Sequence, residues 1–199
     1  MSRERSFHSW ETAALLALCL ALLSGTWAGA RQRSLAAGLV RLHVIAASDD
    51  AEEQALKLQV RDAVLDYLRP RLSGAADAAE ARAILTAELP GVAEAAARVS
   101  EGRAVSVCLG PEEYPRRSYG SFRLPAGRYE SLRVVLGEGR GRNWWCVVFP
   151  PLCLDAVESE PVRSVMSRED YALVSEEEGL APGFWLVDAW GALLNLLRR

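Results

Sequence analysis

The stretch that decides the fold is Gly139-Arg-Gly-Arg-Asn-Trp-Trp-Cys-Val-Val-Phe-Pro-Pro-Leu-Cys153. Residues 147–149 form an apolar run that predicts a buried strand, and Pro150-Pro151 must end it because proline cannot donate to a sheet ladder. The Gly/Arg residues before the strand predict a turn. Trp144 and Trp145 are neighbours, and neighbouring strand residues point to opposite faces of a sheet. We expect one tryptophan to face the core and the other to face solvent or a partner, although Trp145 as simple core filler is an alternative.

The chain around this strand alternates between the two periodicities of regular structure. Period-2 patterns predict strands at 39–46, 104–109, 119–124 and 129–136, with a loop over 110–117 and a hairpin joining the last two strands. Helical patterns, ended by proline or glycine, predict helices over 51–68, 75–89, 90–99, 168–177 and 183–198. The order of one strand, then helices, then a run of strands predicts an α+β fold with a mostly antiparallel sheet and helices packed on one face.

The N-terminus has the pattern of an export signal. Arg3 and Arg5 precede an apolar run over 13–23, and Ala28-Gly29-Ala30 is an A-x-A cleavage site. As a helix the apolar run would span about 17 Å, against a hydrocarbon core of ~30 Å. We therefore expect a signal peptide over 1–30, cleaved after Ala30, with an uncleaved anchor as the alternative. A linker over 31–38 and a single domain over 39–199 follow, and in either case the domain works outside the cytoplasm.

The cysteines fit an oxidising compartment. Cys146 and Cys153 flank the double-proline turn and form a candidate disulfide, which would contribute about 2.5 kcal/mol by closing so short a loop. A pair of buried free thiols is the alternative. Cys108 is left over. A zinc site of three cysteines and His43 is formally conceivable, but no CxxC or HxxxH spacing supports it.

Composition and motifs exclude several function classes. The net charge of the 199-residue chain is −3 and its arginines are scattered, so no nucleic-acid partner is indicated. The sequence has no GxSxG, HExxH or P-loop motif, and we predict no cofactor and no metal. One catalytic alternative remains, an extracytoplasmic cell-wall or thiol-dependent enzyme with Cys146 as nucleophile and His43 as base.

The last helix, over 183–198, is amphipathic. Its apolar stripe includes Phe184, Val187 and Trp190, and Arg198-Arg199 follow at its end. A helix docked on the sheet explains this pattern. The alternative is a peripheral membrane contact, with the two arginines toward lipid headgroups.

Four ordered blocks carry a resemblance to a known family. They are Arg41-Leu-His-Val-Ile-Ala-Ala-Ser48-Asp49, the segment from Gln54 through Lys57 to Val64, Tyr119-Gly with Leu124-Pro-Ala-Gly127-Arg-Tyr129, and the segment from Gly141 to Cys153. Together they resemble stage II sporulation protein R, over roughly 39–153. The NWWC and FPPLC elements are the most specific part. The C-terminal third carries no matching motif.

The resemblance implies a function that composition could not show. Proteins of this family are exported from the forespore into the space between the two membranes of the developing spore. There they activate a membrane-embedded aspartic protease, which cleaves the precursor of the mother-cell sigma factor E. The resemblance therefore implies a secreted signalling protein, not an enzyme.

Residues for partner binding do not come with the resemblance and are inferred from motif density. We expect the extracytoplasmic face of the protease to contact the turn and the two tryptophans, with help from the end of the first strand. The expected contact residues are Arg140, Arg142, Asn143, Trp144 and Trp145, together with His43, Ser48 and Asp49.

Overall fold

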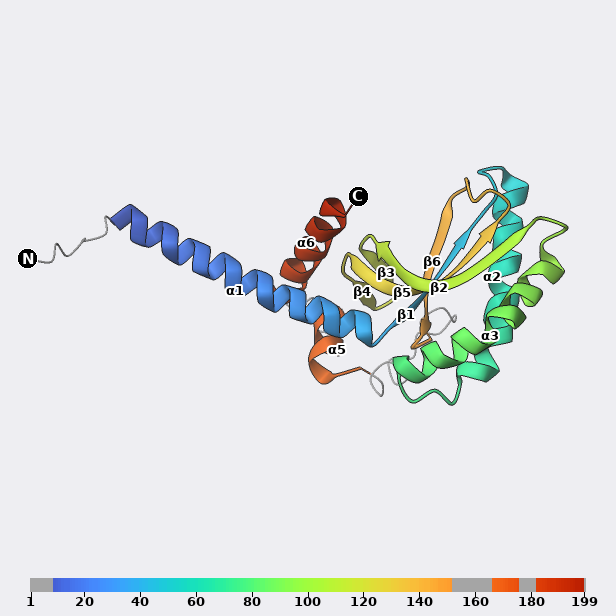
Figure 1. Cartoon of the computed structure of the whole chain (residues 1–199), viewed down its shortest axis with the longest axis horizontal. Coiled ribbons are helices and arrows are strands. Elements are labelled where there is room, and N and C mark those ends of the chain that lie inside the picture. The colour runs from blue at the N-terminus through green and yellow to red at the C-terminus, as the bar shows by residue number, and fades with distance from the viewer. Residues whose placement is uncertain (1–8, 152–165, 176–181, 199) are drawn as a thin grey trace, which may run out of the picture.

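A computed structural model describes residues 9–151, 166–175 and 182–198 (Figure 1). Its first element is the long helix α1 (Ser9–Ala37), whose N-terminal half projects away from the folded domain. Among the described residues, α1 is the one helix that is long and apolar enough to cross a membrane. This apolar helix is compatible with a signal peptide. It continues through residues 31–37, where the sequence suggested a linker.

A four-stranded sheet forms the centre of the domain. Its strands are β1 (Val40–Ile45), β2 (Val105–Tyr114), β5 (Gly127–Leu136) and β6 (Asn143–Phe149), in the order β2-β5-β1-β6. β5 pairs antiparallel with β2 and β1 pairs antiparallel with β6, but β1 and β5 run parallel. The α+β class and the mostly antiparallel sheet are confirmed; the β1–β5 pairing is the parallel one.

The predicted hairpin between 119–124 and 129–136 is wrong. β3 (Arg117–Tyr119) and β4 (Phe122–Leu124) pair with each other as a separate two-stranded sheet. β5 instead joins the main sheet between β1 and β2. The turn at Pro125 and Ala126 thus connects two sheets.

Helices α2 (Ala51–Leu72) and α3 (Ala78–Val99) cover one face of the main sheet (Figure 1). Alternate residues of β1 and β5 point toward α2 and α3. Their side chains and those of the two helices form a fully buried core. This core includes Leu42, Val44, Val60, Leu85, Leu132 and Val134.

The opposite face carries a second apolar cluster, so the prediction of helices on one face only is wrong. The C-terminal part of α1 packs there with α5 (Arg168–Val174), α6 (Pro182–Leu197) and the β3–β4 sheet (Figure 1). The physical reason is that β1, β5 and β6 bury side chains on both faces. Tyr129 and Val147 point into this second cluster, and both are 1 % exposed or less.

Three prolines do not end elements where the sequence suggested. Pro70 and Pro90 lie inside α2 and α3, which makes one helix of the two predicted at 75–89 and 90–99. A proline inside a helix removes one hydrogen bond. α3 packs closely against α2 at this point: a Cβ added at Gly91 would lie 1.8 Å from the Tyr67 hydroxyl of α2. Pro111 lies within β2, which is an edge strand and therefore tolerates a missing N–H.

Candidate functional site

The predicted turn before β6 is fastened to the end of β1. The Gly141 amide donates to the Ala46 carbonyl at 2.9 Å, and the Arg140 amide donates to the Ala47 carbonyl at 3.2 Å. The Arg142 amide donates to the Asp49 carboxylate at 2.6 Å. The structure therefore brings together Ser48, Asp49, Arg140 and Arg142, four of the predicted contact residues.

Gly141 makes the close approach of the turn and β1 feasible. A Cβ built on Gly141 would lie 2.1 Å from the Ser48 carbonyl oxygen. Every residue other than glycine would therefore push the turn away from β1.

Lys57 supports this turn from below, a role that the sequence pattern missed. Lysine side chains are normally exposed, but that of Lys57 is only 5 % exposed. Its ammonium group donates to the Arg142 carbonyl at 3.0 Å and to the Gln54 side chain at 2.6 Å. Gln54 in turn donates to the Ser48 carbonyl. Burial, and next the charge of Arg142, lower the pKa of Lys57.

His43 and Trp145 lie opposite each other on β1 and β6. Their rings stack, with centroids 3.7 Å apart and planes inclined by 14°. Tyr114 meets Trp145 edge-on at 4.5 Å. The same cross-strand row continues through Arg133 on β5 to Cys108 on β2.

Glu112 completes the polar surroundings of His43. Its carboxylate lies 2.8 Å from His43 Nδ1 and 3.9 Å from the Arg133 guanidinium. Burial raises the pKa of Glu112, but the hydrogen bond and charge of His43, with smaller effects of Ser131 and Arg133, lower the pKa overall. Glu112 is therefore held in its ionised form beside the imidazole.

Arg41 lies deeper on the same face and is fully buried. Its guanidinium stands over the rings of Tyr114 and Tyr129, at 3.8 Å and 4.8 Å from their centroids, and donates to the Tyr119 hydroxyl. Among the described residues, its Nε and Nη1 atoms have no hydrogen-bond partner. Aromatic faces thus surround the charge on this side of the sheet.

Trp144 occupies the other face of β6, as the alternation of strand residues predicts. It packs at the margin of the core that lies between the sheet and helices α2 and α3. The Arg61 guanidinium lies 4.9 Å from its ring centroid. The expected split into one core-facing and one solvent-facing tryptophan is not observed, because the sheet is covered on both faces: both rings are half-buried, and each packs against one of the two clusters. Asn143, Arg140 and Arg142 beside them are outward-facing, and the arginine side chains are 77 % and 73 % exposed.

The alternative of a thiol enzyme does not fit this geometry. Cys146 pairs with Leu42 in the sheet, so its side chain points to the face covered by α2 and α3. His43 points to the opposite face. Nucleophile and base are therefore separated by the sheet, and no general-base contact exists between them.

Within the described part of the chain, no cluster of three metal-ligating side chains is found. The thiols of Cys19 and Cys108 are free, and Cys146 is buried. Cys153 lies outside the described residues, so the pairing of Cys146 with Cys153 stays a prediction.

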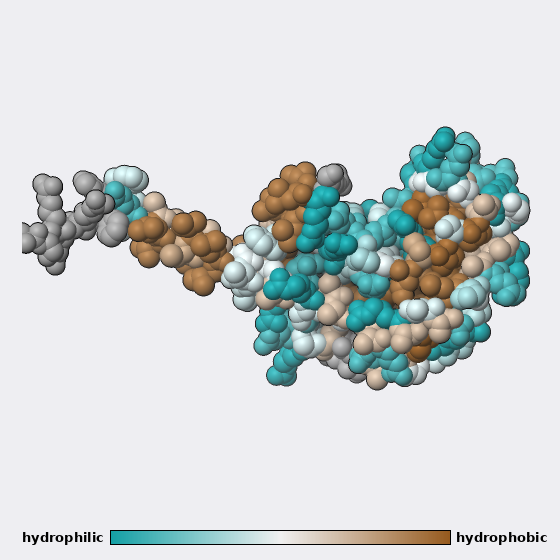
Figure 2. All heavy atoms as spheres, viewed as in Figure 1, coloured by the Kyte–Doolittle hydropathy of each residue, from teal (hydrophilic) through white to brown (hydrophobic). Residues whose placement is uncertain are grey.

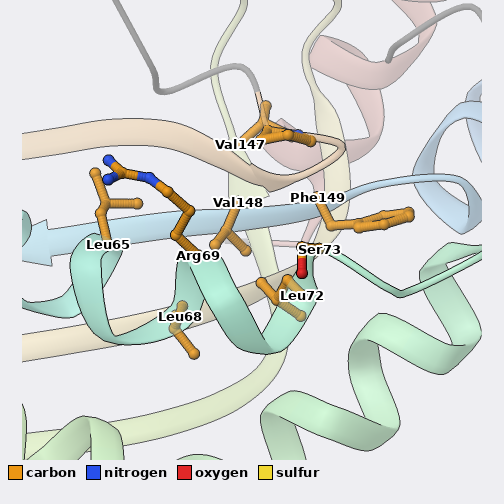
Figure 3. A pocket seen from close by; sticks show the side chains of 9 residues that line it. Leu65, Leu68, Arg69, Leu72, Ser73, Val147, Val148 and Phe149 are labelled. Carbon is orange, nitrogen blue, oxygen red and sulfur yellow. The ribbon is translucent and has the colours of Figure 1, made fainter.

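A small apolar cavity of about 140 Å³ lies between the end of α2 and β6 (Figure 3). In Figure 3, Leu68, Leu72, Val148 and Phe149 line it from the two elements. Among the described residues, Arg69 and Ser73 are the polar side chains of its lining, which includes no carboxylate, thiol or imidazole.

The predicted cleavage site lies within α1. Ala28 is 2 % exposed and packs into the second apolar cluster, whereas Ala30 faces outward. The predicted C-terminal helix is observed as α6, which docks on α1 and β5.

The sequence profile of stage II sporulation protein R matches residues 36–159, more than half of the chain. The chain belongs to the stage II sporulation protein R family. A protein of that name from Bacillus subtilis (strain 168) is 36 % identical over 135 residues, which cover 65 % of this chain. The matched region spans 60 % of the length of that relative. No solved structure matches the chain.

The region shared with the stage II sporulation protein R family contains the whole main sheet and both helices behind it. It also contains every residue of the turn and of the His43–Trp145 row. α6 lies outside the matched region.

Proposed function

We propose that this protein is an exported sporulation signal that activates a membrane-embedded aspartic protease. The protease would then cleave the inactive precursor of the mother-cell sigma factor E. The proposed site of action is the space between the forespore and mother-cell membranes, and the protein acts as a ligand, not as an enzyme. Family membership supports a role in sporulation.

The observation that carries the proposal is the construction of one surface, which we call the turn surface: Ser48, Asp49, Arg140, Arg142 and Asn143. Its main-chain atoms are tied to β1, while its charged side chains reach into solvent. Lys57 is buried beneath it and donates to the Arg142 carbonyl, and the half-buried Trp144 and Trp145 follow it on β6. Rigid support beneath exposed charged and aromatic groups is typical of a protein-binding surface.

Activation has a simple physical form. The protease would exist in an inactive and an active arrangement, and a ligand shifts this balance only through a higher affinity for the active one. An aspartic protease needs two carboxylates side by side. Binding of the turn surface to the extracytoplasmic face of the protease would favour the arrangement in which these carboxylates meet.

Reconstitution in a non-sporulating bacterial host tests the proposal. The protease and the sigma-factor precursor would be co-expressed with and without this chain, and precursor length followed on a blot. We expect processing only when the exported chain is present. A folded, exported chain that leaves the precursor intact would contradict the proposal.

Two variants then locate the contact. We expect Trp144→Ala and Arg142→Ala to abolish or strongly reduce processing while the protein stays folded. Arg98→Ala is the matched control, because Arg98 is an exposed arginine on α3 that pairs with Glu94. Equal processing by Arg142→Ala, Trp144→Ala and the control would place the contact elsewhere.

A further inference from the structure

The part of α1 that contains the predicted cleavage site is built into the folded domain. Its buried residues recur at helical spacing and lie along one side of the helix: Gly25, Ala28, Gly29, Gln32 and Leu35. This side packs against α6 and the second apolar cluster. Cleavage after Ala30 would remove the first three of these residues.

Glycines and tryptophans interlock α1 with α6. Trp190 of α6 lies over Gly25 and Gly29, where an added Cβ would come within 3.0 Å of its ring atoms. In return, Trp27 of α1 lies against Gly183 of α6, where a Cβ would come within 2.4 Å. Small residues let two helices approach closely, and here each helix offers glycine to a tryptophan of the other.

Polar contacts hold the following turn of α1 in the same position. Ser34 donates to the Asp170 carboxylate at 2.7 Å, and Arg31 forms an ion pair with Glu169. The Gln32 amide donates to the Arg128 carbonyl at 3.3 Å. α1 is thus fixed on both sides of the Ala28-Gly29-Ala30 motif.

The projecting half of α1 has the properties of a membrane span. Its leucines are exposed, and α1 is long and apolar enough to cross a membrane. Trp10 and Trp27 are exposed at its two ends, about 26 Å apart along a helix, close to the ~30 Å of a bilayer core. Tryptophan prefers both membrane interfaces, and Arg3 and Arg5 place the N-terminus on the cytoplasmic side.

α6 has an apolar outer side next to the point where α1 would leave the membrane. Trp185, Leu186, Leu193, Leu196 and Leu197 are between 46 % and 72 % exposed. Figure 2 shows hydrophobic surface both on the projecting part of α1 and on α6 beside it. A bilayer surface would cover these side chains.

We propose that the mature protein keeps α1 as a membrane anchor, and that its packing against α6 protects the A-x-A motif from signal peptidase. Proteolysis proceeds most readily at exposed, irregular segments. The motif is instead helical, and its first two residues are covered. The domain is then exported but remains tethered to the outer face of the membrane from which it emerges. This inference does not rest on the activation of a protease.

The experiment measures the mature N-terminus of the exported full chain. The chain would be expressed in an exporting bacterial host, external protease would verify that the domain is outside, and intact mass would be determined after membrane extraction. We expect the mass of the uncleaved chain, in a membrane fraction that resists alkaline carbonate. A soluble product that begins at Arg31 would overturn the proposal.

Two variants test the role of packing. Trp190→Ala uncovers Gly25 and Gly29, and we expect at least a tenfold rise in the fraction cleaved after Ala30. Leu58→Ala is the control, because Leu58 is a partly exposed apolar residue of α2 and belongs to neither α1 nor α6; we expect its cleaved fraction to equal that of the wild type. If Trp190→Ala remains as intact as the control, protection by α6 is refuted.

Discussion

The imidazole of His43 stacks on the indole of Trp145 across the β1–β6 ladder, with ring centroids 3.7 Å apart. This contact joins the middle of the sheet to the strand that follows the turn surface. Because Glu112 fixes the other side of the imidazole, both rings have a defined position. β6, the strand that follows the turn surface, is therefore held in place by the stacking of Trp145 on His43.

Loss of this stack should destabilise the domain. Trp145→Ala removes the stack with His43 and the edge contact with Tyr114, and we expect the free energy of unfolding to fall by about 2 kcal/mol, since the ring is half-buried. Urea denaturation followed by circular dichroism measures it. Trp145→Phe keeps an aromatic ring and should recover at least half of the loss. A loss below about 0.5 kcal/mol for the alanine variant would refute the supporting role of the stack.

The lowered pKa of Glu112 predicts a defined pH dependence. Since the pKa is lower in the folded than in the unfolded protein, Glu112 stabilises the fold above its unfolded pKa of about 4.3. That stability is lost as pH falls through the folded pKa. Wild type should exceed Glu112→Gln in stability by about 1 kcal/mol at pH 7, and the difference should vanish at low pH.

Denaturation of both proteins from pH 7 down to pH 3 checks this. Glu113→Gln is the matched control, because Glu113 is the neighbouring carboxylate of β2 on the other side of the strand. A difference between wild type and Glu112→Gln that stays constant with pH would contradict the prediction.

Gly141 offers a direct test of the turn surface. Gly141→Ala forces the turn away from the Ser48 carbonyl, and we expect a loss of about 1–3 kcal/mol in stability together with weaker precursor processing. Gly110→Ala is the control, because an added Cβ there meets nothing within 4 Å. Thermal unfolding of the two variants gives the comparison. Equal stabilities would mean that the close approach at Gly141 is not required.

Lys57 is the chain's only lysine, which makes its burial measurable. An amine-reactive reagent should modify Lys57 slowly in the native protein and rapidly in urea, because the ammonium group is enclosed by Gln54 and the Arg142 carbonyl. Gln54→Ala removes one of these partners and should speed the reaction severalfold. Peptide mass spectrometry reads the modified fraction. Native and unfolded protein reacting at the same rate would refute the burial.

Much of the fold could be predicted from sequence because its signals are local. The alternation in β1, the apolar run of β6 and the opposite facing of Trp144 and Trp145 follow from the period of a strand. Ser167 immediately before α5 is a residue type that favours the N-cap, and it accepts a hydrogen bond from the Asp170 amide. These features need only a few neighbouring residues.

The missed features depend on contacts distant in sequence. The parallel pairing of β1 with β5 joins residues about ninety apart, and no local pattern encodes it. Arginine and lysine are normally exposed, so no local signal indicates the burial of Arg41 and Lys57; tyrosine rings surround the first, and the second donates to the Arg142 carbonyl. α3 likewise continues past Pro90, next to its close approach to α2 at Gly91.

The short connection between α1 and β1 has a mechanical consequence. Only Gly38 and Leu39 separate the end of the helix from the first residue of the strand. Tension applied along α1 therefore reaches β1, which is hydrogen-bonded to β5 on one side and to β6 on the other. Because these bonds lie across the direction of pull, they carry the load together, in shear. A domain anchored by α1 is thus expected to resist a pulling force from a bound partner, because β1 cannot separate from the sheet one hydrogen bond at a time.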